Sequence, residues 1–503
     1  MIGATYSMAH YELYQQTKDK NLFEEIVDKL VLDDIPGMTD IFKQKILSLD
    51  RDKKRMAILS LLDKDRNLFL KIKALFDKNI NRMEHIKDIV TMLREYVKVG
   101  EVEKKKFGEV MTPLDLIKEM ISKLPKSVWS NPNLKWLDPC NGAGPFSSMI
   151  TFRLMKGLSN VIPDEEKRYK HIVENMIYVC ELQPKNMFVY LCTMDTFDSY
   201  KLNVYCGSFL DGGFDYHMKN VWGVEKFDII LGNPPYQQKL EENRKTKPLW
   251  NIFVFKALTI LNEDGFLNMI HPSGWRNIDG VFKNIQTEFK NRNLLFLKMH
   301  TVQDGEKVFG ATTSFDFYVL QNNQKYVNTE IVDTKGETNK IDISKLEIIP
   351  NFDIEKILKF FANDSEEKVQ VLYSRSIYGT DKKNMQNTNN DEFIYPCVYS
   401  VLKSGKFNLF YSNENKGQFG VKKIICGNGA NPTFFTDDEG RYGLTQFSFG
   451  IVDDENFDLI VDILKSGKQS YITEATKFIS TNGNPIMYPK IVSLFKKDFW
   501  KYI

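Results

Sequence analysis

Hydrophobic and polar positions along the chain fall into three regions, of which the first has a helical pattern. Between residue 8 and about residue 105, stretches such as Phe23–Leu32, Lys45–Leu62 and Leu68–Leu75 carry apolar residues three and four positions apart. This is the spacing of one face of an amphipathic helix. Pro36-Gly37 interrupts the pattern as a turn between two helices would. We predict a helical N-terminal region over residues 1–105.

The second region, residues 106–335, has short apolar runs that end at Gly, Pro, Asn or Asp and alternate with longer amphipathic stretches. This alternation is typical of an α/β domain. The expected strands are Leu134–Leu137, Met176–Cys180, Leu202–Tyr205, Phe227–Leu231, Gly265–Ile270, Leu294–His300 and Phe315–Leu320. Because ligands in open α/β sheets bind outside the carboxyl ends of the strands, we expect a site in the loops that follow them.

The third region, residues 336–503, joins short β-like runs rich in aromatic residues through Asn- and Lys-rich turns such as Lys382–Asp391. The pattern predicts a separate domain of mixed α/β or mainly β structure. A chain of 503 residues is long enough for about three domains of ordinary size.

Composition narrows the class of protein only in part. The hydrophobic share of 42% allows compact cores, and the formal net charge of +2 gives no overall argument for a polyanionic partner. Six cysteines without C-x-x-C spacing argue against a disulfide framework or a zinc site, and we expect no metal. Since neither a signal peptide nor an apolar run of membrane-spanning length is evident, we expect a soluble, cytoplasmic protein.

The segment most informative about chemistry is a predicted strand that stops at the loop Asn233-Pro234-Pro235-Tyr236. Two successive prolines fix the backbone, so the Asn233 side chain and the Pro234 carbonyl can be held rigidly at the strand end. Both present hydrogen-bond acceptors, which suits an amino group with two N–H bonds. Tyr236 supplies a face on which a flat heterocycle can stack. An ordinary proline turn is the alternative interpretation.

Two other strand ends carry groups that suit a nucleotide-like ligand. Asp138-Pro139-Cys140-Asn141-Gly142-Ala143-Gly144 is a glycine-bearing turn before a helix that begins near Phe146, and its glycines let backbone approach a ligand. Asp138 can meet a cationic or hydroxyl group. Glu181 ends the next strand, where a parallel nucleotide-binding sheet binds ribose hydroxyls. A dinucleotide site or a plain turn would explain the glycine segment equally well in isolation.

In this order, these motifs resemble the gamma class of N6-adenine DNA methyltransferases from restriction–modification systems. The resemblance covers roughly Phe107 to Leu320 and includes Val110-Met111-Thr112-Pro113, the glycine turn, Glu181 and the Asn-Pro-Pro-Tyr loop. It implies a Rossmann-like, class I S-adenosylmethionine-dependent methyltransferase domain between the helical region and a C-terminal target-recognition domain. It also implies transfer of a methyl group from S-adenosylmethionine to a flipped-out adenine in double-stranded DNA.

The resemblance assigns roles to individual residues. Thr112 and Pro113 would contact the methionine part of the cofactor, the turn with Asp138, Pro139, Gly142 and Gly144 would wrap it, and Glu181 would bind its ribose. Phe253 would lie against the cofactor adenine, and Phe309 would pack with Tyr236 on the flipped base. Ordinary core packing is the alternative for both phenylalanines.

One position departs from the family's pattern. The third strand's loop usually carries an Asp that accepts from the amino group of the cofactor adenine, whereas Cys206-Gly207-Ser208-Phe209-Leu210-Asp211 has a serine there. Either Ser208 substitutes through its hydroxyl or Asp211 reaches back. The sequence leaves both possibilities open.

DNA contacts are expected in the third region, where Lys422 and Lys423 precede Asn428 in a glycine- and asparagine-rich stretch. A solvated turn is the alternative there. Three other functions stay open: N4-cytosine methylation, methylation of a protein glutamine amide, and a non-catalytic DNA-binding subunit with the same fold. Any restriction endonuclease would be a separate chain.

Overall fold

The computed structural model describes residues 20–62, 112–195, 199–239, 246–277, 282–373, 384–402, 406–415, 418–427, 433–476 and 489–503. The predicted helical stretch Leu68–Leu75, the pair Val110-Met111 and the predicted DNA contact Asn428 lie outside these residues. Within them, no helix combines the length and apolar character needed to cross a bilayer.

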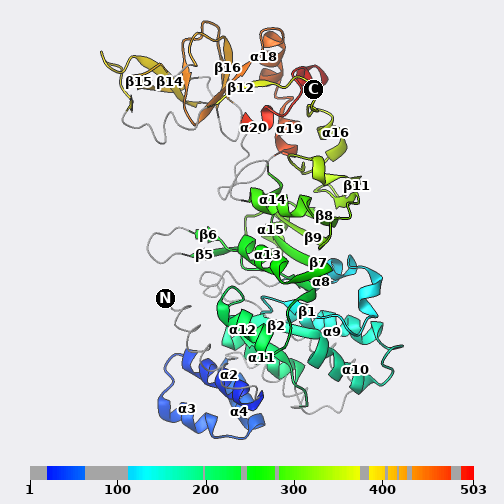
Figure 1. Cartoon of the computed structure of the whole chain (residues 1–503). Helices are drawn as coiled ribbons and strands as arrows, with labels where there is room; N and C mark the ends of the chain where they lie inside the picture. Colours follow the sequence, from blue (N-terminus) through cyan, green and yellow to red (C-terminus); the bar gives the residue numbers. More distant parts are fainter. Residues whose placement is uncertain are drawn as a thin grey trace.

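A nine-stranded sheet forms the centre of the molecule, with the strand order β11-β10-β8-β9-β7-β4-β1-β2-β3 (Figure 1). The strands are β1 (Trp136–Asp138), β2 (Ile177–Glu181), β3 (Asn203–Cys206), β4 (Phe227–Gly232), β7 (Leu261–Pro272), β8 (Asn293–His300), β9 (Phe315–Gln321), β10 (Thr329–Val332) and β11 (Thr338–Ile341). β1 to β4 and β7 are parallel, and β9 lies antiparallel between β7 and β8. All seven predicted strands are present, and the sheet extends to Ile341, past residue 335.

Both faces of this sheet are covered by helices, because successive strand residues point to opposite faces and both sets are apolar. In β4, Ile229 and Leu231 belong to one buried cluster, whereas Ile230 belongs to the other. The first cluster is covered by α8 (Leu114–Ser122), α9 (Pro145–Gly157), α10 (Glu165–His171) and α11 (Pro184–Met194). The second is covered by α12 (Gly212–Asn220), α13 (Trp250–Thr259) and α14 (Lys283–Lys290). The predicted α/β fold with a mainly parallel sheet is confirmed.

Several short elements complete this domain. They are η1 (Lys126–Trp129), η2 (Ile172–Met176), η3 (Ser273–Arg276), η4 (Ile343–Lys345), α15 (Val302–Phe309) and a two-stranded hairpin of β5 (Gln237–Lys239) and β6 (Thr246–Pro248). The hairpin pairs with no strand of the large sheet.

The N-terminal helices α2 (Lys20–Asp34), α3 (Asp40–Leu47) and α4 (Arg51–Leu62) pack on the large domain through α2 and α11. Gly37 forms the predicted turn between α2 and α3 with a φ of +79°. Arg55, with 2% of its side chain exposed, pairs with Glu24 at 3.0 Å and donates to the carbonyl of Asp195 at 3.2 Å. Buried residues of α2 and α4 share the first hydrophobic cluster of the sheet, so this region continues that core.

The C-terminal region contains two four-stranded sheets, ordered β12-β19-β16-β17 and β13-β15-β14-β18. Their strands are β12 (Gln370–Leu372), β13 (Met385–Gln386), β14 (Tyr395–Val401), β15 (Phe407–Ser412), β16 (Lys423–Gly427), β17 (Phe434–Asp437), β18 (Gly443–Leu444) and β19 (Ser448–Val452). The helices are α16 (Ile354–Leu358), α18 (Phe457–Ser466), α19 (Ser470–Ala475), α20 (Pro489–Val492) and η6 (Phe499–Tyr502). Asn351 joins this region to the large domain, since its backbone N–H donates to Ala475 at 2.7 Å and its Oδ1 accepts from Arg276 at 2.9 Å.

Candidate active site

The topology of the sheet brings the predicted motifs together at one edge. β1 pairs with β2 on one side and with β4 on the other, so the chain order reverses at β1 and β4. In doubly wound sheets the crevice outside the carboxyl ends of the strands at such a reversal is where ligands bind. Asp138 ends β1, Glu181 ends β2 and Asn233 follows β4. All three therefore lie at the same edge.

The glycine turn after β1 is tied to the end of β2. The backbone N–H of Gly142 donates to Glu181 Oε2 at 2.8 Å, and the N–H of Asn141 donates to the carbonyl of Cys180 at 3.0 Å. Gly142 and Gly144 have φ values of +57° and +99°, in the region that side chains rarely adopt. A Cβ on Gly144 would also lie 2.6 Å from the Tyr190 ring. The turn therefore requires glycine at this position.

Asp138 is a carboxyl group buried without a counter-ion. Only 2% of the residue is exposed, Oδ1 accepts from the Cys140 N–H at 3.1 Å, and Oδ2 has no hydrogen-bond partner in the described part of the chain. Burial, together with the nearby charge of Glu181, raises the pKa of Asp138 from its ordinary value of 3.8 to about 8. A cationic ligand beside Oδ2 would stabilise the carboxylate form.

The Asn-Pro-Pro-Tyr loop is held by a contact that sequence reasoning did not find. Asn233 Nδ2 donates to Thr112 Oγ1 at 3.1 Å across 121 positions, and Thr112 is 3% exposed. Because Nδ2 of Asn233 donates to Thr112, the Oδ1 atom of the same amide is directed away from Thr112. Pro113, the N-cap residue of α8, is exposed beside it. No pattern near either residue signals this contact.

Tyr236 and Phe309 lie next to each other, whereas their contact with a flipped base stays a prediction. Their ring centroids are 6.2 Å apart at an angle of 85°, and Phe309 also packs edge-on against Phe315 at 4.9 Å. Burial raises the pKa of the Tyr236 hydroxyl well above its ordinary value of 10. The ring therefore stays a neutral stacking surface at any ordinary pH.

In the loop after β3, Asp211 serves as a helix cap. Its Oδ1 accepts from the Phe214 N–H at 3.0 Å, at the start of α12, and from the Tyr205 hydroxyl at 3.1 Å. Ser208 Oγ accepts from the Leu210 N–H at 3.2 Å.

Phe253 of α13 lies 6% exposed beside this loop, with its ring 5.3 Å from that of Phe209. The predicted aromatic and the predicted third-strand loop are therefore neighbours. Whether Phe253 contacts a cofactor stays a prediction.

One predicted DNA contact is wrong. Lys423 is completely buried, and its Nζ forms an ion pair with Asp437 at 2.7 Å and donates to the carbonyls of Gln418 and Val421. Its charge is satisfied inside the protein and cannot reach a phosphate. Lys422 is exposed, and its Nζ lies 4.0 Å from the centre of the Phe457 ring.

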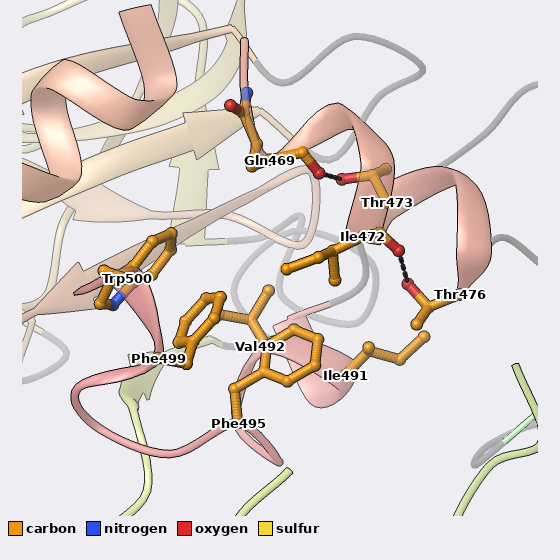
Figure 2. A pocket seen from close by; sticks show the side chains of 9 residues that line it. All are labelled: Gln469, Ile472, Thr473, Thr476, Ile491, Val492, Phe495, Phe499 and Trp500. Carbon is orange, nitrogen blue, oxygen red and sulfur yellow. Dashed lines mark hydrogen bonds between the residues drawn. The ribbon is translucent and has the colours of Figure 1, made fainter. Parts of the chain in front are cut away.

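A pocket in the C-terminal region is a different kind of site (Figure 2). Ile472, Val492 and Phe495 are among its lining residues, and the hydroxyls of Thr473 and Thr476 donate to backbone carbonyls of α19 and the residue before it. None of its lining side chains is charged. It therefore lacks the groups found at the sheet edge.

Comparisons with known proteins agree with the geometry of this edge. A family model described as "Eco57I restriction-modification methylase" matches residues 180–309, which run from the end of β2 to Phe309. A curated relative from Mycoplasma pneumoniae, described as an uncharacterized adenine-specific methylase, is 26% identical over 312 residues, 47% of this chain and 73% of the relative. The chain is therefore similar to methylases of the restriction–modification type. The predicted resemblance is confirmed at this level, whereas its gamma-class subdivision stays a prediction.

Solved structures similar to this chain include MmeI, a type IIL restriction–modification enzyme in complex with DNA. It is 11% identical, the match covers 94% of this chain and 78% of that chain, and the TM-score is 0.47. A putative class I S-adenosylmethionine-dependent methyltransferase from Listeria monocytogenes is 14% identical, with 62% and 93% covered and a TM-score of 0.36. With TM-scores below 0.5, the assignment rests on the family model, the curated relative and the site itself.

Proposed function

We propose that this protein transfers a methyl group from S-adenosylmethionine to the exocyclic N6 of an adenine flipped out of double-stranded DNA. The observation that carries the proposal is the Asn233 amide, fixed at the end of β4 by Thr112 and followed by the paired rings of Tyr236 and Phe309. The adenine preference agrees with the description of the curated relative.

The residues at the sheet edge fit S-adenosylmethionine. Asp138 offers an unpartnered buried oxygen to a cation, and the positive-φ glycines leave the turn after β1 without side chains. Glu181 holds that turn through Gly142 and presents carboxylate oxygens suited to ribose hydroxyls. When bound, the cofactor supplies a methyl group made electrophilic by its positive sulfur.

Oxygen atoms of the Asn-Pro-Pro-Tyr loop would orient the target amino group. Asn233 Oδ1 and the Pro234 carbonyl accept the two N6 hydrogens, which directs the nitrogen lone pair out of the ring plane for direct in-line transfer. Tyr236 and Phe309 stack on the extruded base and offset part of the cost of unstacking, a few kcal/mol. Transfer would leave a neutral thioether, and the methylated N6 would lose one of its two protons to solvent, so no covalent enzyme intermediate is needed.

Asp211 and Ser208 differ in how their oxygens are used. Asp211 Oδ1 accepts two hydrogen bonds that cap α12 and hold Tyr205. We assign the contact with the cofactor adenine to Ser208, whose hydroxyl lies three residues closer to β3. Phe253 would then lie against the same adenine, beside Phe209.

A labelled-cofactor assay tests the function. The protein is incubated with methyl-labelled S-adenosylmethionine and either duplex DNA or a translation release factor, and the DNA is digested to nucleosides. We expect label in N6-methyl-2′-deoxyadenosine only, and sequencing of the product maps the site. Label in N4-methyl-2′-deoxycytidine or in the release factor would support the rival functions.

Asn233→Ala is the matched control for catalysis. It removes the side-chain acceptor, so it should abolish transfer while cofactor affinity stays close to that of the wild type. Wild-type protein that binds DNA but transfers no methyl group to any of these substrates would support a non-catalytic subunit. A partner endonuclease on a separate chain remains part of the proposal.

A further inference from the structure

Two exposed lysines lie on the elements next to the Tyr236–Phe309 ring pair, which are the hairpin that begins after Tyr236 and the helix that ends at Phe309. Lys247 lies on β6, opposite Gln238 of β5, and Lys307 lies on α15, two residues before Phe309. Both side chains are exposed, and the charge of Lys307 contributes to lowering the pKa of Asp304. We propose that Lys247 and Lys307 bind the DNA backbone phosphates on either side of the flipped nucleotide.

The hairpin places Lys247 at a fixed distance from Tyr236. β5 begins directly after Tyr236, and the Leu249 N–H closes the base of the hairpin by donating to the Tyr236 carbonyl at 3.0 Å. Lys247 is two residues from Leu249, about 7 Å along a strand. A base stacked on Tyr236 therefore has its backbone within reach of the Lys247 ammonium group. Figure 1 shows β5 and β6 leaving the body of the domain.

The helix gives Lys307 a comparable relation to Phe309. Residues two apart on a helix point to nearly opposite sides, and accordingly Phe309 is 4% exposed while Lys307 faces solvent. Gly310 ends α15 with a φ of +63°. The stacking ring and the cation are thus held on one rigid element. Phe309 packs against the Tyr236 ring, whereas Lys307 lies on the solvent side of the same helix, where it can meet a backbone phosphate.

Lys256 and Lys298 differ from Lys247 and Lys307 because their charges are paired with acids. Lys256 pairs with Asp215 at 2.8 Å, and Lys298 pairs with Glu119. The hairpin itself adds little to the core, since an isolated two-stranded ribbon is only marginally stable. An exposed element of this kind, attached directly to the proposed stacking residue, is a place where function rather than packing is expected.

This inference rests on the proposed function, and salt dependence tests it separately. Duplex affinity is measured against salt concentration, with an oligonucleotide carrying the adenine site mapped by the sequencing experiment above. Each phosphate contact contributes about 0.9 to the slope of log K against log salt. Lys247→Ala or Lys307→Ala should therefore lower the slope by about 0.9 and weaken binding about eightfold at about 0.1 M salt. The double variant should lose about 1.8 in slope.

Lys226→Ala is the matched control. Lys226 is exposed directly before β4, at the opposite end of the strand that leads to Asn233. It should keep the wild-type slope, and all variants should keep the wild-type cofactor affinity and melting temperature. Unchanged slopes in both lysine variants, an equal loss in Lys226→Ala, or a loss that accompanies a fall in melting temperature would each overturn the assignment. Wild-type protein that neither binds nor methylates the duplex would instead refute the proposed function.

Discussion

The buried carboxyl group of Asp138 predicts that one conservative substitution stabilises the protein and removes cofactor binding. In Asp138→Asn, the amide oxygen can still accept from the Cys140 N–H, as Asp138 Oδ1 does now at 3.1 Å. What changes is the charge. Oδ2, which has no partner among the described residues, is replaced by a group that cannot ionise.

The sign of the effect follows from the raised pKa. Asp138 has a pKa of about 8 in the folded protein and about 3.8 when unfolded. Between these values the folded state retains a proton that the unfolded state has lost, so the free energy of unfolding of the wild type falls as pH rises from about 4 to about 8. Each pH unit is worth about 1.36 kcal/mol, which gives an upper limit of about 5 kcal/mol at pH 8. The free energy of unfolding of Asp138→Asn does not fall in this way as pH rises.

Denaturant unfolding of the cofactor-free proteins at several pH values between 5 and 8.5 measures the difference. The advantage of Asp138→Asn over the wild type should grow with pH and level off near pH 8. Calorimetry of the wild type at pH 7 in buffers of different ionisation enthalpy should show release of close to one proton when S-adenosylmethionine binds, and the variant should show no binding. A stability difference that is independent of pH, or wild-type cofactor affinity in Asp138→Asn, would refute the reasoning.

Three further substitutions test other contacts. Thr112→Val should slow single-turnover methyl transfer about tenfold, because it frees the Asn233 amide, whereas Thr112→Ser should restore the rate; a change confined to the cofactor Kd would show that Thr112 acts on the cofactor instead. Ser208→Asp should tighten cofactor binding about fivefold, since a charged acceptor forms a stronger hydrogen bond than a hydroxyl, and unchanged binding in a calorimetric titration would exclude this contact. Lys423→Met should lower the free energy of unfolding by about 3 kcal/mol by leaving Asp437 buried without its partner, measured by denaturant unfolding; a drop in DNA affinity without loss of stability would restore Lys423 as a phosphate contact.

Local patterns sufficed to predict the strands and the loops that follow them. Phe227–Leu231 is a continuous apolar run that ends at Gly232, and the structure has β4 over Phe227–Gly232. The helical stretch Lys45–Leu62 was predicted only in outline, because α3 ends at Leu47 and α4 begins at Arg51. Apolar spacing does not reveal such a break, whereas the Asp50 side chain, which accepts from the Lys53 N–H at 3.0 Å, helps to make it.

Contacts between distant segments could not be predicted from local patterns. Asn233 and Thr112 are 121 positions apart, and their hydrogen bond depends on how α8 reaches the end of β4. Lys422 and Lys423 show that the directions of neighbouring side chains could not be predicted from local patterns either. Adjacent residues at the start of a strand point in opposite directions, so Lys422 is exposed while Lys423 points inward to Asp437.

The position of the active-site edge follows from connectivity more than from any single residue. Because β1 lies between β2 and β4, Glu181 at the end of β2 and Asn233 after β4 must lie on either side of the turn that follows Asp138. Gly232 shows how closely they approach, since a Cβ there would lie 3.0 Å from Asp138 Oδ1 and 3.2 Å from the Cys140 sulfur. The order of the strands thereby brings a buried acid that suits a cation and an amide that suits an amine to the same edge of the sheet. This proximity is what a methyl transfer between a sulfonium and an exocyclic nitrogen requires.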